Sequence, residues 1–298
     1  MVFGGDLKEN TRSLNEKFQN GEKLTWITCY DYSFATVIES TNVDMILVGD
    51  SGGMAALGYK DTTPVTMEEM IVLASAVRRG APNKFIVGDL PKGSYEVSDE
   101  DAVRNALRFI KESGCDAVKL EGDNERILSR VKAIVDSGIV VIGHIGLTPQ
   151  SIAQQGGYRV VGRDEGEISR LHEGTKSLIK AGVFSVLLEA VPPNLARDIS
   201  EKSNTIIFGI GAGPFVHGQL LILHDLIGLF PDFRPKFAKC FIPQIITTYL
   251  EDIRDLSENK EFFKIDGLFY ISKLAIEAFV TEVKHDLFPS KEFSYKDN

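Results

Sequence analysis

Residues 43–51 read VDMILVGDS, a short run of aliphatic residues that ends in Gly49, Asp50 and Ser51. A run that is apolar throughout is typical of a strand buried on both faces of a sheet. The same unit recurs: an apolar, often β-branched run, then Gly or an acidic residue, then a segment with helical period. The runs lie at 24–29, 44–49, 84–88, 116–120, 139–143, 183–188 and 205–209. This alternation predicts repeated βα units and a parallel sheet.

The segments between these runs carry helical patterns at 66–79, 99–113, 124–136, 166–181 and 194–203, and several begin after a Thr, Ser or Asn suited to capping. A doubly wound sheet and a closed barrel share this local pattern. Seven runs, with a plausible eighth at 220–224, favour an α/β fold of the (β/α)8 TIM-barrel type. In such barrels the chemistry lies at the carboxyl ends of the strands.

The chain of 298 residues is 43% hydrophobic and has no linker of low complexity, so we expect one barrel domain over 1–298. The regular units stop near residue 225, and residues 241–298 are predicted to form a C-terminal helical extension of the same domain. Its most amphipathic stretch is 265–283. This extension is expected either to cap the bottom of the barrel or to pack against another subunit.

Composition excludes several classes of function. The net charge is −9, with no basic block, which argues against a nucleic-acid partner. No apolar run approaches a membrane span, and the first 20 residues lack the apolar core of a signal peptide. The three cysteines, at 29, 115 and 240, form no CxxC pair and are expected to be reduced thiols. These features predict a cytoplasmic protein without a membrane partner.

Three acidic residues directly follow or end predicted strands: Asp50, Asp89 and Glu121. Hard oxygen ligands in small number suit Mg²⁺, which keeps positions open for water and for substrate oxygens, and a 2-oxo acid chelates such an ion well. Each acid taken alone could instead cap the next helix. Their occurrence at three neighbouring strand ends favours a metal site.

Three further residues complete the candidate site. Lys119 has the same facing as Glu121, so it could bind a substrate oxyanion, form an ion pair with a neighbouring carboxylate, or do both. Glu189 ends an apolar run and is the best candidate for a general base, although it could simply point into solvent. His144 is either a donor to the substrate or a histidine satisfied within the core. The long segment 146–166, GLTPQSIAQQGGYRVVGRDEG, is either a lid or an inert loop.

Several segments together resemble the ketopantoate hydroxymethyltransferase family over about residues 20–240. They include LVGDS at 47–51, VKLEG at 118–122, GHIGLTPQS at 143–151, LLEAVP at 187–192 and GQLLILHDLIGL at 218–229. The resemblance implies a barrel of the phosphoenolpyruvate mutase and isocitrate lyase superfamily. It also implies transfer of a hydroxymethyl group from 5,10-methylenetetrahydrofolate to 3-methyl-2-oxobutanoate, which gives 2-dehydropantoate for pantothenate and coenzyme A synthesis.

Carried over residue by residue, the resemblance implies that Asp50 and Asp89 bind Mg²⁺ and that Glu121 completes its sphere, directly or through water. It implies that Ser51 and Lys119 contact the substrate, with Asp89 and His144 in the same pocket, and that Glu189 is the base. It further implies a homo-oligomer, a decamer in this family.

The chain departs from the family pattern in four places. Leu73 stands where the family usually has histidine, Lys92 where it has phenylalanine, and His217 where it has an acidic residue; an expanded tail spans about 243–267. These departures concern folate affinity, substrate preference and subunit packing rather than the metal and base set. A Mg²⁺-dependent lyase or mutase acting on another 2-oxo acid is the alternative enzyme, and a diverged binding protein that kept the fold is the non-enzyme alternative.

Overall fold

The structure is a computed structural model, and it describes residues 8–230, 234–247 and 267–297. Eight parallel strands pair in sequence order and close into a barrel, with β8 hydrogen-bonded to β1. The strands are β1 (Leu24–Thr28), β2 (Met45–Val48), β3 (Phe85–Asp89), β4 (Ala117–Glu121), β5 (Val140–Gly146), β6 (Ser185–Glu189), β7 (Ile206–Ile210) and β8 (Gly218–Leu221). The predicted (β/α)8 barrel is therefore confirmed.

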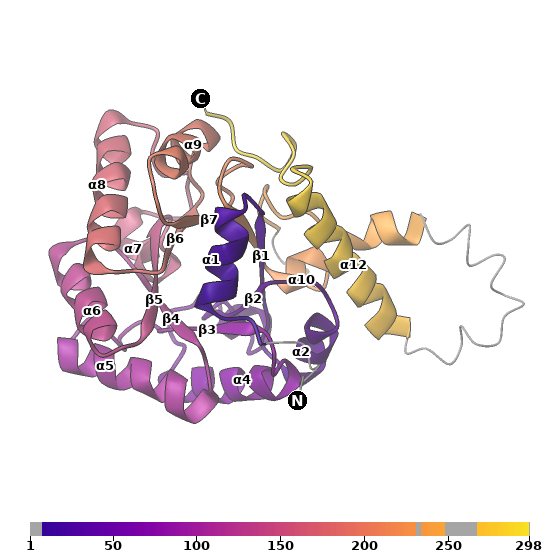
Figure 1. Ribbon diagram of the computed structural model, residues 1–298, viewed down its shortest axis with the longest axis horizontal. Helices are drawn as coiled ribbons and strands as arrows, with labels where there is room; N and C mark the ends of the chain where they lie inside the picture. Colours follow the sequence, from indigo (N-terminus) through magenta and orange to yellow (C-terminus); the bar gives the residue numbers. More distant parts are fainter. Residues whose placement is uncertain (1–7, 231–233, 248–266, 298) are drawn as a thin grey trace, which may run out of the picture.

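Helices alternate with the strands and surround them (Figure 1). They are α1 (Thr11–Gln19), α2 (Tyr32–Glu39), α3 (Gly52–Ala55), α4 (Met67–Gly80), α5 (Asp99–Arg108), α6 (Glu125–Asp136), α7 (Ile152–Gln155), α8 (Glu165–Ala181), α9 (Pro193–Glu201), α10 (Leu223–Leu226) and α12 (Gly267–Lys284). Thr66, Ser98 and Asn124 cap α4, α5 and α6 through their side chains, so the expected caps are confirmed.

The eighth strand differs from its prediction. It runs over Gly218–Leu221, whereas the prediction was 220–224, and residues from Leu223 form α10 instead. Gly218 pairs with Leu24 of β1 and with Phe208 of β7, where an added Cβ would lie 2.6 Å from the Phe208 ring. The strand thus begins at a glycine, a residue that local sequence preference places in turns.

The helix predicted over 99–113 also differs, because it changes type after Arg108. The segment η1 (Phe109–Ser113) is a π-helical turn that ends at Gly114 in the left-handed conformation. The Ser113 hydroxyl donates to the Phe109 carbonyl at 2.6 Å within this turn. The wider turn places the Phe109 ring against Gly88 of β3, where an added Cβ would lie 2.3 Å from the ring.

Different parts of the chain cover the two ends of the barrel. Helix α1 lies at the amino-terminal ends of the strands, where Lys17 pairs with Asp44 at 2.7 Å and the Phe18 ring contacts His217 at 4.8 Å (Figure 1). The other end carries the βα loops. The C-terminal helix α12 is confirmed and packs outside the barrel against α2 and β1. Most of the tail predicted as an expansion, about 243–267, lies outside the described residues.

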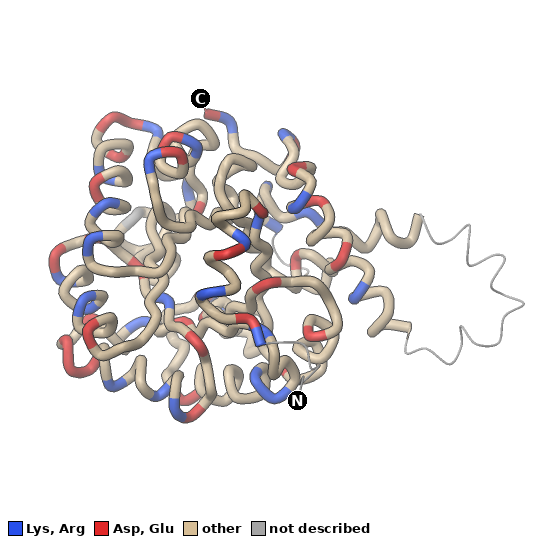
Figure 2. The backbone as a smooth tube through the Cα atoms, viewed as in Figure 1, with Lys and Arg blue, Asp and Glu red and all other residues tan. Residues whose placement is uncertain are grey.

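Surface charge is mixed. Figure 2 shows acidic and basic residues interspersed along the outer helices. Within the described ranges, none of the helices combines the length and the apolar character that crossing a membrane requires.

Candidate active site

The strand register brings the predicted site residues together at the carboxyl ends of the strands. Asp89 of β3 lies beside Lys119 of β4, and Glu121 of β4 lies beside His144 of β5. Gly146 of β5 lies beside Glu189 of β6. Residues paired in a parallel sheet point to the same face, so these side chains share the mouth of the barrel.

None of the three candidate metal-binding acids caps a helix. The N-cap positions after β2, β3 and β4 belong to Ser51, Ser98 and Asn124. The capping alternative for Asp50, Asp89 and Glu121 is therefore wrong. All three carboxylates are buried, with 4%, 1% and 5% of their surface exposed, respectively.

Lys119 lies at the centre of this acidic group. Its Nζ lies 2.8 Å from Asp89 Oδ1 and 3.8 Å from Glu121 Oε1, and the side chain is 3% exposed. Burial alone lowers the pKa of this lysine, but the charges of Asp89, Glu121 and Asp50 outweigh burial and raise it above the ordinary value. Lys119 is therefore held as a cation inside the barrel.

Burial and neighbouring charges raise the pKa values of Asp50 and Asp89. Burial, followed by the charges of Asp89 and Glu121, raises the pKa of Asp50 well above the usual carboxyl value. Burial also raises the pKa of Asp89, although the adjacent Lys119 opposes the shift. The backbone N–H of Asp50 donates to Asp89 Oδ2 at 3.1 Å, so the two acids are neighbours. The single positive charge of Lys119 therefore does not fully balance the negative charges of Asp50 and Asp89.

His144 bridges the acidic group and the candidate base. Its Nδ1 lies 3.2 Å from Glu121 Oε1, and its Nε2 lies 3.1 Å from Glu189 Oε2. Burial and Lys119 lower the pKa of this histidine, but Glu121 and Glu189 outweigh them and raise it to about 9. The contact with His144 also changes the pKa of Glu121. Burial raises that pKa, but His144 and Lys119 outweigh burial and lower it. His144 thus lies between two carboxylates that favour its protonated form, while its Nδ1 is also 3.3 Å from the Lys119 ammonium.

Glu189 occupies a constrained position. Its side chain is 16% exposed, so it is neither sealed in the core nor free in solvent. The next residue, Ala190, has φ +50°, a left-handed conformation that residues with a Cβ seldom adopt. Gly146 is required beside it, because a Cβ there would lie 2.3 Å from the Glu189 carbonyl oxygen. The backbone around the candidate base is therefore closely fixed.

Two residues that the sequence did not single out belong to the same group. Gln150, in the turn η2 (Pro149–Ser151), donates from Nε2 to Asp50 Oδ2 at 2.9 Å, and its backbone N–H donates to Glu121 Oε2 at 3.1 Å. Tyr95 donates its hydroxyl to Gln150 Oε1 at 2.7 Å. Neither residue ends a strand or carries a charge, so no strand-end pattern marks them.

Ser51, predicted to contact the substrate, directly follows Asp50 in the chain. Its Oγ is 2.8 Å from the hydroxyl of Tyr30, which is buried. Leu73, one of the departures, packs near the same point, with its Cδ1 3.3 Å from where a Cβ on Gly52 would lie. Lys92, another departure, pairs with Glu96 at 3.3 Å.

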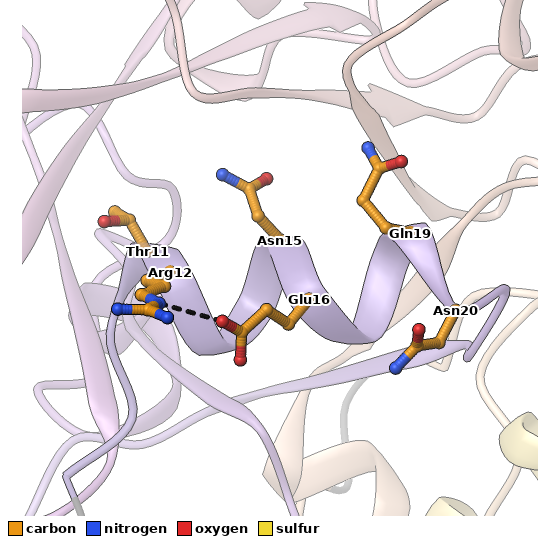
Figure 3. Close-up of a pocket in the computed structure, with 6 residues that line it drawn as sticks. All are labelled: Thr11, Arg12, Asn15, Glu16, Gln19 and Asn20. Carbon is orange, nitrogen blue, oxygen red and sulfur yellow. Dashed lines mark hydrogen bonds and ion pairs between the residues drawn. The ribbon is translucent and has the colours of Figure 1, made fainter.

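A separate surface pocket of about 600 Å³ lies along α1, far from the site in the fold because α1 covers the amino-terminal ends of the strands (Figure 3). It is lined by Thr11, Arg12, Asn15, Glu16, Gln19 and Asn20. None of the predicted site residues lines it.

In the part of the chain that the structure describes, no three His, Cys, Asp or Glu side chains converge as a ready-made metal-binding group. Glu121 is engaged by His144 and by the Gln150 amide. The arrangement can nevertheless hold a hard cation through two carboxylates with water or substrate oxygens, the coordination that Mg²⁺ prefers.

Comparison with known proteins decides the family. A sequence model of ketopantoate hydroxymethyltransferase matches residues 8–291. The chain belongs to the ketopantoate hydroxymethyltransferase family. A 3-methyl-2-oxobutanoate hydroxymethyltransferase of Thermoanaerobacter sp. (strain X514) is 43% identical over 97% of this chain and 96% of its own. One from Heliobacterium modesticaldum is 50% identical over 75% and 81%.

Solved structures share the barrel. A 2,3-dimethylmalate lyase of the PEP mutase/isocitrate lyase superfamily aligns with a TM-score of 0.54 and 18% identity, over 92% of this chain and 98% of its own. A phosphonopyruvate hydrolase in complex with oxalate and Mg²⁺ aligns with a TM-score of 0.57 and 10% identity, over 93% and 98%. At these identities the likeness concerns the fold alone.

Proposed function

We propose that this protein transfers a hydroxymethyl group from 5,10-methylenetetrahydrofolate to 3-methyl-2-oxobutanoate and so makes 2-dehydropantoate for pantothenate synthesis. The family and its named relatives support this activity. The observation that carries the chemistry is the contact chain at the mouth of the barrel, in which Glu189 meets His144, and His144 meets Glu121 beside Lys119. A candidate base and buried charges for an acidic substrate thus occupy one site.

The donor set fits a divalent cation. Asp50 and Asp89 are buried neighbours whose pKa values are raised by burial and, in addition, by nearby carboxylates. A cation between them would relieve that repulsion, and we assign Mg²⁺ to these two ligands with Glu121 as the outer member. When bound, Mg²⁺ polarises the carbonyl of a 2-oxo acid and makes the adjacent C–H acidic.

The chain's own residues then have distinct tasks. Glu189 removes the proton from C3 of 3-methyl-2-oxobutanoate, and the electron pair of that C–H bond passes into an enolate. The Lys119 ammonium stabilises the negative charge that develops on the substrate. Carbon C3 then bonds to the one-carbon unit of the folate in place of one of its two C–N bonds, and the oxygen of a water molecule replaces the other. Tetrahydrofolate leaves, and its two freed nitrogens take up the proton removed from C3 and one proton of that water. We assign the orientation of the acid to Ser51, which contacts Tyr30, and to His144, which contacts Glu189.

Assembly and location extend the proposal. We infer a homo-oligomer, because apolar side chains near the C-terminal extension stay exposed, among them Leu229 (54%), Ile246 (42%) and Leu268 (72%). Sedimentation velocity of the purified chain tests this.

We also place the protein in the cytoplasm: Cys29, Cys115 and Cys240 are all free thiols, which a reducing compartment preserves.

The decisive experiment follows deuterium exchange at C3 of 3-methyl-2-oxobutanoate by NMR, with Mg²⁺ and without folate. The wild type is expected to exchange this proton, and Glu189→Gln to slow exchange at least ~100-fold, because general-base catalysis contributes that much or more. Glu173→Gln, an exposed change of the same kind on α8, is the matched control and should exchange normally.

The outcomes separate the alternatives. Absence of exchange in the wild type would overturn the transferase proposal. Exchange in the wild type without product on adding methylenetetrahydrofolate favours a lyase or mutase of another 2-oxo acid. Undiminished exchange in Glu189→Gln would overturn the role of Glu189 alone.

A further inference from the structure

We propose that Gln150, oriented by Tyr95, is a positioning residue that fixes the carboxylate of Asp50 for metal binding and ties it to Glu121. The inference rests on the proposed function only in assigning the cation to Asp50. It concerns a residue that carries no charge and does not itself need to touch the ion.

Gln150 follows β5 and contacts residues at the ends of three other strands. Its side-chain Nε2 donates to Asp50 Oδ2, after β2, and to the Leu90 carbonyl, after β3, both at 2.9 Å. Its backbone N–H donates to Glu121 Oε2, at the end of β4, at 3.1 Å. The residue itself follows β5 and is 4% exposed. One side chain therefore connects the ends of β2 and β3, and its backbone reaches β4.

The orientation of the amide is specified. Both hydrogens of Nε2 are used, on Asp50 and Leu90, while Oε1 accepts the Tyr95 hydroxyl at 2.7 Å. The Tyr95 oxygen in turn accepts the backbone N–H of Glu121 at 3.3 Å, and its own hydrogen points to Gln150. An amide turned the other way would place Oε1 against the Leu90 carbonyl oxygen, which can only accept a hydrogen bond, so the network favours one orientation.

This orientation matters because Asp50 lies in a poor electrostatic environment. Its carboxylate is buried next to Asp89, so two acidic groups lie close together with little water around them. A neutral donor that holds Oδ2 stabilises the charged form without adding a competing cation. Because one oxygen is fixed, the direction of the other is fixed as well. Residues that orient metal ligands in this way typically change metal affinity 10–100-fold when they are replaced.

The test measures Mn²⁺ binding to the full chain by electron paramagnetic resonance, without substrate. Gln150→Met keeps the length and unbranched shape of the side chain and removes its amide; we expect Mn²⁺ to bind at least ~10-fold more weakly. Tyr95→Phe removes the hydroxyl that donates to the amide. It should also weaken Mn²⁺ binding, but by less than Gln150→Met does. Gln19→Met, on the outward face of α1 (Figure 3), is the matched control and should bind as the wild type does.

Kinetics give a second readout. Gln150→Met should raise the Mg²⁺ concentration for half-maximal rate and recover much of kcat at saturating Mg²⁺. A residue that only stabilises the fold would lower the thermal midpoint and leave Mn²⁺ affinity unchanged, and that result in Gln150→Met would overturn the proposal. If Gln150→Met does not fold, unchanged affinity in Tyr95→Phe overturns it. Failure of the wild type to bind Mn²⁺ counts against the metal assignment itself, whereas the ratio of variant to wild type reports on Gln150.

Discussion

The pKa values of His144, which is buried, and His217, which is half-buried, shift in opposite directions because the two histidines have different neighbours. His144 lies between Glu121 and Glu189, and these carboxylates raise its pKa to about 9 despite burial. His217 lies near the amino-terminal ends of the strands, where burial and then Lys23 lower its pKa to about 4. Its Nδ1 accepts the backbone N–H of Ile207 at 3.0 Å, a contact that requires an unprotonated nitrogen. The departure from the family pattern at 217 is therefore compatible with the barrel only in its neutral form.

His217 predicts sensitivity to acid. The unfolded chain takes up a proton near the ordinary pKa of ~6.5, while the folded chain resists it down to about 4, so this stability is complete above pH ~6.5 and is lost as the pH falls. Between pH 7 and 5 we expect this group to cost about 1–2 kcal/mol of unfolding free energy. Urea unfolding of His217→Asn should show a smaller loss over that range, because asparagine takes up no proton there. Its amide oxygen can replace Nδ1 as the acceptor for the backbone N–H of Ile207.

His285→Asn, on the exposed turn after α12, is the matched control and should retain the wild-type dependence on pH. An unchanged slope in His217→Asn would contradict the prediction.

At this scale the sequence predicted that the charged residues would lie together at one end of the barrel, but not that Gln150 and Tyr95 would join them. Asp50, Asp89 and Glu121 could be predicted because strand ends of a barrel meet at one face, whatever the loops do. Gln150 and Tyr95 could not, since both lie in loops and their positions depend on contacts across the barrel. The bridge formed by His144 also depended on strand register, which the sequence pattern does not give.

The elements were predicted to within a few residues where periodicity decided them. Strand β3 was expected at 84–88 and lies at Phe85–Asp89, and the helix expected at 124–136 is α6 (Glu125–Asp136). The π-helical turn η1 was missed, because its cause is tertiary. The Phe109 ring packs where Gly88 leaves room, and no local pattern in 99–113 records that contact. The proposed lid over 146–166 stays a prediction.

The contact between η1 and β3 predicts the effect of one methyl group. Gly88→Ala would place a Cβ 2.3 Å from the Phe109 ring, so the helix must shift, and we expect a loss of about 1–3 kcal/mol in unfolding free energy from overpacking. Because Gly88 precedes Asp89, activity should fall as well. Guanidinium unfolding of the purified variant measures the loss.

A double-mutant cycle tests the cause. Phe109→Leu creates space at the same point, so the double variant should lose less stability than the sum of the two single variants. Strict additivity would show that the ring contact is not responsible.

The C-terminal extension packs along the outside of the barrel. Helix α12 lies against α2 and β1, on the outside of the strands that close the ring. Glu277 accepts from the backbone N–H of Asn42 at 2.9 Å, and Lys239 pairs with Glu282 at 2.5 Å. The chain beyond α12 returns to α9, where Asp297 accepts the backbone N–H of Asn194 at 2.8 Å. The extension thus spans from the β1 side of the barrel to α9.

These contacts predict that barrel and extension unfold together. Phe279 of α12 is fully buried, and its ring lies 6.0 Å from Phe241 and 5.8 Å from Phe288. Phe279→Ala should lower the free energy of unfolding by about 3–5 kcal/mol, the usual cost of such a cavity. If residues 1–298 form one domain, the loss will appear in a single transition, seen alike by far-ultraviolet dichroism and by fluorescence of Trp26 inside the barrel.

Two separate transitions, with the Trp26 signal unaffected by Phe279→Ala, would instead make the extension an independent unit. The exposed change Leu287→Ala, a few residues along the same segment, is the control for removing apolar surface without a cavity. It should leave the transition within about 0.5 kcal/mol of the wild type. The single cooperative transition is expected because α12 packs against β1, so a cavity in the extension weakens the same sheet that positions the candidate acids.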